Sequence, residues 1–74
     1  MSIRDVLRQM KEDRIFSTIA NAEHESWLRQ SEPRHRKHHI LQRLVEKYER
    51  RGCHELVQKA LRYSHQERVK RYAE

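Results

Sequence analysis

The 74-residue sequence has very little glycine, proline or cysteine, with one residue of each. Sheet-rich domains need more turn-forming residues than one glycine and one proline provide, so helices are favoured. A single cysteine, Cys53, excludes a disulfide framework and the paired-cysteine spacings of structural zinc sites. Because a lone thiol is typical of a reducing compartment, we expect a cytoplasmic protein.

Long hydrophobic runs and catalytic motifs are also missing. No stretch of the sequence has the length and apolarity of a membrane span, and the N-terminus lacks the apolar core of a signal peptide. The sequence has no glycine-rich phosphate loop, no nucleophile elbow and no paired-carboxylate motif. A chain this short encloses no substrate-sized pocket. We therefore expect a protein that is not an enzyme, uses no cofactor and has no small-molecule substrate or membrane partner.

The length sets the domain organisation. A chain of 74 residues forms one domain, so residues 1–74 are predicted to be a single small helical domain. Domains of this size bury a limited fraction of their surface and are marginally stable alone. With no disulfide or zinc site to help, self-association is the remaining common stabiliser, and we expect a homo-oligomer, such as a dimer.

Positive charge is concentrated in the middle of the sequence. The net charge is +6. Residues 1–28 carry four basic and five acidic groups, a net charge of −1, whereas residues 29–51 carry eight and three, a net charge of +5. Residues 52–74 carry five basic and three acidic groups, a net charge of +2. A basic region of this kind attracts nucleic acid or an acidic protein surface.

The same basic region has the clearest helical pattern in the chain. Its apolar residues fall on one face of a helix with 3.6 residues per turn. Pro33 precedes the pattern, and a helix tolerates proline at its start. Gly52 follows the pattern, and glycine is common just after the end of a helix. We therefore predict a helix over residues 34–51. The apolar positions are Ile40, Leu41, Leu44, Val45 and Tyr48.

The N-terminal third leaves two alternatives open. Ser2 followed by Asp5 resembles a capping box and predicts a helix start. The apolar residues of positions 3–10 then give way to a second apolar set over positions 15–27, rotated by about 150° around the helix. Either the helix breaks near residues 11–14, or one long helix presents different faces to different neighbours. The segment 29–33 is predicted to be a loop.

The C-terminal part is predicted to contain two short helices. Gly52 allows a tight reversal into a helix over residues 53–63, and the S-x-x-E pattern at Ser64 predicts a final helix from His65 to about Ala73. Two helices joined by so short a connection are expected to pack antiparallel. The predicted fold is all-α: a bundle of three to four short helices around an antiparallel hairpin over residues 33–63.

The basic residues of the predicted central helix are the candidate binding site. Helices prefer acidic groups in the first turn, but this helix begins with cations, a placement that favours an anionic ligand such as phosphate. Cations further along share roughly one face, opposite the apolar residues. The alternative is that these charged side chains lie in solvent and bind no ligand. The candidate residues for binding nucleic acid or an acidic partner are Arg34, Arg36, Lys37, Arg43, Lys47, Arg50 and Arg51.

Three histidines at the start of this helix have several interpretations. His35 and His39 are four residues apart, a spacing that lets two imidazoles share a metal ion, and His38 lies between them. Spacing alone is weak evidence, and no carboxylate accompanies the pair, so we assign no metal site. The alternatives are pH sensing among neighbouring cations and a solvated basic face.

Two functions from different classes fit these observations. The first is a small basic regulatory protein that binds nucleic acid through phosphate contacts of the central helix, with an affinity that falls steeply with salt. The second is a small inhibitor or adaptor that docks on an acidic or amphipathic surface of a partner protein. The second function needs an apolar anchor, for which Trp27 and Leu28 are the candidates.

Overall fold

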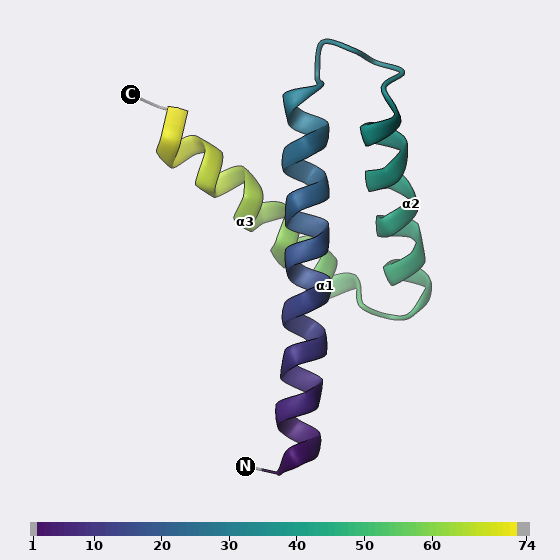
Figure 1. Cartoon of the computed structure of the whole chain (residues 1–74), viewed down its shortest axis with the longest axis vertical. Coiled ribbons are helices and arrows are strands. Elements are labelled where there is room, and N and C mark those ends of the chain that lie inside the picture. The colour runs from purple at the N-terminus through teal and green to yellow at the C-terminus, as the bar shows by residue number, and fades with distance from the viewer. Residues whose placement is uncertain (1, 73–74) are drawn as a thin grey trace.

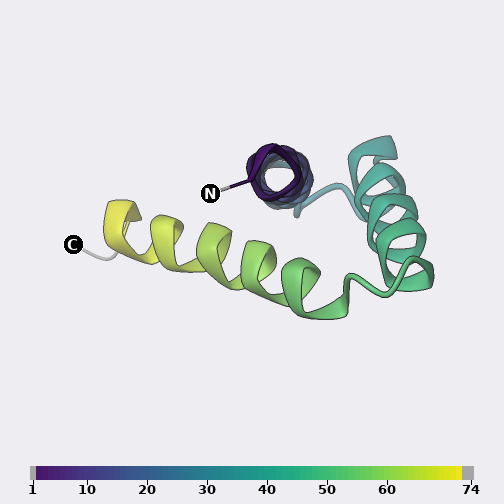
Figure 2. The same ribbon diagram turned by 90° about the horizontal axis from the view of Figure 1, so that it is seen from below.

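The computed structural model describes residues 2–72 and is all-helical over that range, with three helices. They are α1 (Ile3–Leu28), α2 (Arg36–Arg50) and α3 (His54–Tyr72). α2 runs back beside α1, and α3 crosses α1 obliquely (Figure 1). Seen along α1, α2 and α3 lie on different sides of it and diverge from their connection (Figure 2). The molecule is flat, with extents of 45 × 30 × 15 Å, which is little more than one helix diameter in its thinnest direction.

The first helix is continuous, which settles the two alternatives for the N-terminal third. α1 begins at its Ser2 cap, whose side chain accepts a hydrogen bond from the Asp5 backbone N–H at 3.3 Å, and no break occurs at residues 11–14. The rotated apolar set has a structural reason. Ile15 and Ile19 pack into the core, whereas Ile3 is 79% exposed, because the N-terminal part of α1 extends beyond the other two helices (Figure 1).

The C-terminal part is one helix rather than two. α3 continues through Ser64 without interruption, so the predicted helix start at His65 is wrong. Ser64 is buried in the middle of α3, where its hydroxyl accepts a hydrogen bond from Arg68 Nη1 at 3.0 Å. The predicted end of the final helix at Ala73 lies outside the described residues.

Gly52 ends α2 as its position in the sequence predicts. Its φ of +81° is in the left-handed region that favours glycine. The Gly52 N–H donates to the Glu49 carbonyl at 3.0 Å and the Cys53 N–H donates to the Tyr48 carbonyl at 2.9 Å. These two bonds form a Schellman motif, which satisfies carbonyls at the end of the helix.

The core lies between α1 and α3, and not within the predicted hairpin of residues 33–63. Ile15 and Ile19 of α1 pack against Val57 and Ala60 of α3. α1 contacts both other helices extensively, whereas α2 and α3 contact each other least. Ala60 of α3 is fully buried in this core, while the divergence of α3 from the Gly52 turn limits its contact with α2 (Figure 2). The structure therefore does not confirm the α2–α3 hairpin as the centre of the fold.

Candidate basic interface on the second helix

The outer face of α2 carries a row of cations because its apolar residues, apart from the exposed Ile40, turn towards the rest of the protein. Val45 and Tyr48 pack against the core, which leaves the basic side chains of α2 in solvent, except for the half-buried Lys37. At 100° per residue the four exposed cations lie within about 60° of one another, and at 1.5 Å per residue they span about 21 Å. We call these four residues the basic row: Arg36, Arg43, Lys47 and Arg50.

The basic row has no acidic partner within the described residues. No carboxylate of residues 2–72 lies within ion-pair distance of any of its four side chains. The acidic residues of α2 have other partners: Glu46 accepts a hydrogen bond from Gln42 at 3.3 Å, and Glu49 lies 2.8 Å from His54 Nδ1. The charge of the basic row is therefore available to a ligand.

The remaining predicted site residues differ in how they are held. Arg34 is exposed in the α1–α2 connection, and Arg51 caps α2 with its guanidinium carbon 5.8 Å from the Tyr48 ring centroid. Lys37 is half-buried, and its Nζ lies 3.9 Å from Glu25 Oε2 of α1. The structure thus keeps Arg34 and Arg51 near the ends of the basic row but turns Lys37 towards α1.

The histidines at the start of α2 hold the α1–α2 connection together. His35 caps α2, since its Nδ1 accepts a hydrogen bond from the Lys37 backbone N–H at 3.1 Å. His38 Nε2 lies 2.9 Å from the carbonyl oxygens of both Arg29 and Glu32. Because carbonyls only accept, Nε2 carries a proton, and Nδ1 forms a hydrogen bond with the Ser26 hydroxyl. The sequence does not reveal these roles of His35 and His38, because histidine is not among the residues that usually cap helices.

No grouping of metal ligands occurs in the described part of the chain. Among residues 2–72, no three or more His, Cys, Asp or Glu side chains gather in a way that could hold a metal ion. His39, the third histidine of the start of α2, is exposed. In the same residues no helix is long and apolar enough to cross a membrane.

The two predicted anchor residues at the end of α1 have different surroundings. The Trp27 ring stacks on Tyr72, with ring centroids 5.5 Å apart, and the Arg68 guanidinium carbon lies 5.0 Å from its centroid. Leu28 is 46% exposed. Leu28 is therefore accessible to a partner, whereas Trp27 is already packed within the protein.

A buried ion pair that sequence reasoning missed joins α1 to α3. Both terminal nitrogens of Arg68 donate to the Glu23 carboxylate, with Nη2 2.6 Å from Oε1. Burial by itself would raise the pKa of Glu23. Hydrogen bonds from Arg68 and Ser64, together with the positive charge of Arg68, outweigh it and hold the pKa of that carboxyl below its ordinary value. The two partners are 45 positions apart, and no local pattern pairs them.

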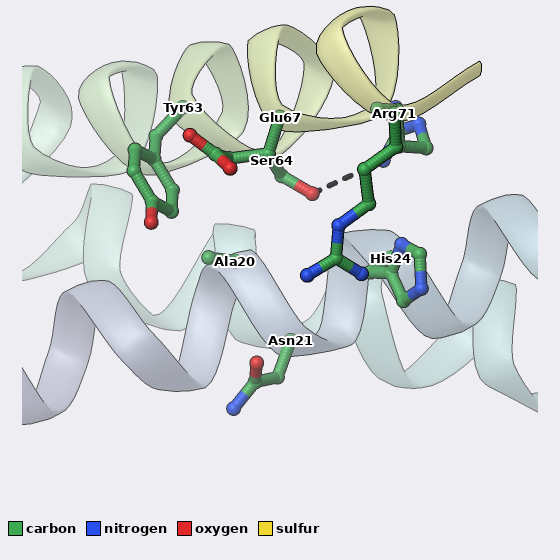
Figure 3. Close-up of a pocket in the computed structure, with 8 residues that line it drawn as sticks. Ala20, Asn21, His24, Tyr63, Ser64, Glu67 and Arg71 are labelled. Carbon is green, nitrogen blue, oxygen red and sulfur yellow. Dashed lines mark hydrogen bonds between the residues drawn. The ribbon is translucent and has the colours of Figure 1, made fainter.

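An open pocket of about 200 Å³ adjoins this ion pair. Arg71 reaches from α3 towards His24 of α1, and Tyr63 and Glu67 lie nearer the start of α3 (Figure 3). The walls carry both signs of charge, so they select no ligand by its charge. The lining residues are Ala20, Asn21, His24, Tyr63, Ser64, Glu67, Arg68 and Arg71.

No family model, curated protein or solved structure matches the chain. Its function is therefore inferred from the site itself.

Proposed function

We propose that this chain is a small, non-enzymatic, cytoplasmic regulatory protein that binds nucleic acid through phosphate contacts of the basic row. The observation that carries the proposal is that Arg36, Arg43, Lys47 and Arg50 share one exposed face without a carboxylate partner among residues 2–72. Charges that the fold does not pair are free to release the counterions of a nucleic-acid backbone. Arg34 and Arg51, exposed just beyond the two ends of α2, add positive charge near the basic row.

The first turn of α2 supports the same proposal. It contains no acidic residue, although helix N-termini favour negative charge. Arg36 in that turn therefore lowers stability by a few tenths of a kcal/mol. No ion pair among residues 2–72 compensates for this loss. A bound phosphate would interact favourably with both the side chain and the dipole of the helix.

The test is a salt titration of binding to a labelled duplex, followed by fluorescence anisotropy. The variant Arg43→Ala with Lys47→Ala removes two charges from the basic row, and the magnitude of the slope of log affinity against log salt should fall by about two. Its matched control is Lys70→Ala with Arg71→Ala, which removes the same charge at the far end of α3, across α1 from α2 (Figure 1). The control should keep most of the wild-type slope. Absence of binding at low salt would overturn the proposal.

We also propose that the chain self-associates through the N-terminal part of α1. Ile3, Val6, Leu7 and Met10 lie on one face of that helix and are all exposed, Leu7 by 59%. Pairing of two such faces would bury apolar surface that the monomer leaves in water. Light scattering after size exclusion should give the mass of a dimer, and Leu7→Glu with Met10→Glu should give that of a monomer. A monomeric wild-type protein at high concentration would contradict self-association.

A second candidate function, docking on an acidic or amphipathic surface of a partner protein, is favoured by Ile40. This residue is 42% exposed and lies beside Arg36 and Lys47 around the helix. A phosphate backbone does not need an apolar side chain among cations, whereas an amphipathic protein surface does. Truncation of Leu28 or Ile40 to alanine should weaken such a complex more than loss of any single charge.

A further inference from the structure

All five aromatic rings of the chain are engaged within the protein. Phe16 packs on Tyr63, with ring centroids 5.2 Å apart, and Trp27 stacks on Tyr72. Tyr48, the remaining ring, is half-buried against the core. Proteins that bind single strands without sequence preference use aromatic rings as platforms on which unpaired bases stack. The availability of rings near the basic row therefore decides which form of nucleic acid it can hold.

The outer face of α2 offers no such platform. Tyr48 is the one aromatic residue of α2, and Lys47 Nζ and Arg51 Cζ lie 5.4 and 5.8 Å from its ring centroid. The rings with substantial exposure, Tyr63 and Tyr72, belong to α3. The C-terminal end of α3 points away from α2, on the other side of α1 (Figures 1 and 2). A single strand lying along the basic row would find cations but no ring.

Apart from its cations, α2 has few side chains suited to reading bases. Gln42 is the side-chain amide of α2, and an amide is the group best suited to adenine. Its Nε2 donates to Glu46 Oε1 at 3.3 Å, so it would have to give up that hydrogen bond to contact a base. Contacts of the basic row to phosphates position a protein on nucleic acid but carry no sequence information.

The geometry of the basic row suits a rigid, densely charged ligand. Its cations are held on one straight helix over about 21 Å. A duplex presents one negative charge per about 1.7 Å of its axis, roughly twice the density of one strand. A flexible single strand would also have to be ordered along the row, without stacking to offset the lost entropy.

From these observations we propose that the ligand of the basic row is double-stranded nucleic acid, bound through backbone phosphates without preference for sequence. The inference rests on the proposed function and narrows it to one form of nucleic acid. It assigns the interaction to Arg36, Arg43, Lys47 and Arg50, and it gives none of the five aromatic rings a place at the interface.

The experiment compares two labelled duplexes of unrelated sequence with one separate strand of each, across a salt series. The two duplexes should bind within about twofold of each other, and each should bind several-fold more tightly than its strand. With four phosphate contacts, the slope of log affinity against log salt should be about −3.6 for duplex and about −2.8 for single strand. Emission of Trp27, the single tryptophan, should stay unchanged when either ligand saturates the protein, since no base stacks on it.

Variants and a competitor separate the outcomes. Gln42→Ala should leave both duplex affinities unchanged, and a change in their ratio would overturn the lack of sequence preference. Single strands that bind as tightly as duplexes, or that quench Trp27, would overturn the duplex assignment while leaving the proposed function standing. If neither form binds at low salt, both proposals fail. Competition by polyglutamate as effective as that by unlabelled duplex would assign the row to an acidic protein instead. Circular dichroism checks that each variant is folded.

Discussion

Arginine has two different uses in this protein, and the contrast between them shows how position decides its role. Arg68 of α3 is 8% exposed and both its terminal nitrogens bind Glu23. Arg43 of α2 is exposed and has no carboxylate partner among residues 2–72. The fold depends on the first and not on the second. Residue type and net charge do not separate the two; their surroundings do.

Removal of the Arg68 side chain should lower the stability of the protein most. Arg68→Ala leaves the Glu23 carboxylate in a partly buried site without its partner, which should cost about 3 kcal/mol of unfolding free energy. Arg43→Ala should change it by less than about 0.5 kcal/mol. Urea unfolding followed by circular dichroism measures both. Equal midpoints for the two variants would show that the buried pair contributes no more than an exposed side chain.

A smaller loss is expected at the turn that joins the basic helix to the core helix. Gly52→Ala should cost about 1–2 kcal/mol, because an L residue pays that much in the left-handed region. A Cβ at this position would meet no atom within 4 Å, so the cost comes from the backbone alone. Thermal unfolding measures the effect, and duplex binding per folded molecule should be unchanged. An unaltered melting temperature would mean that the turn relaxes without strain.

Acid should weaken the buried pair and leave the charges of the basic row intact. The pKa of folded Glu23 is below its ordinary value of 4.5, so its contribution to stability is fully present above that value. The contribution is lost as pH falls through the lower folded pKa. Unfolding midpoints measured from neutral pH to below pH 4 should therefore fall less steeply for Glu23→Gln than for wild type. Glu12→Gln, at an exposed position, should keep the wild-type dependence.

A small effect on stability is expected at Lys37, whose surroundings are intermediate between those of Arg68 and Arg43. It belongs to the basic helix, but its Nζ is 3.9 Å from Glu25, with both side chains partly exposed. Ion pairs of this kind contribute little, so Lys37→Ala should cost about 0.5 kcal/mol or less. It should also weaken duplex binding less than Arg43→Ala does. If Lys37→Ala weakened duplex binding more than Arg43→Ala, Lys37 would belong to the binding interface.

The helical character of the chain could be predicted from its sequence, and the packing of the helices could not. Ser2 and Gly52 act locally, and the structure has the cap and the left-handed turn at those positions. The change of apolar phase in α1 has two physical causes that look alike in sequence, a break or a change of neighbour. Only the structure shows that the N-terminal part of α1 extends past the other helices (Figure 1). Ser64 has the pattern of a cap but is buried mid-helix beside Arg68.

The candidate site could likewise be predicted from the sequence only in part. The exposed side of α2 follows from helical periodicity, so the placement of Arg43 and Lys47 together needed no tertiary information. The partners of Lys37 and Trp27 come from other helices, Glu25 of α1 and Arg68 of α3. Contacts between helices depend on how α1 is oriented against its neighbours, which no local pattern specifies.

The most direct test of the basic row as the binding site is the salt dependence of duplex binding for wild type, Arg43→Ala with Lys47→Ala, and Lys70→Ala with Arg71→Ala. The magnitude of the slope should fall by about two for the α2 variant and stay near the wild-type value for the α3 variant. Equal losses for the two variants would show that binding follows net charge alone. That result would contradict the claim that the basic row of α2 is the binding site.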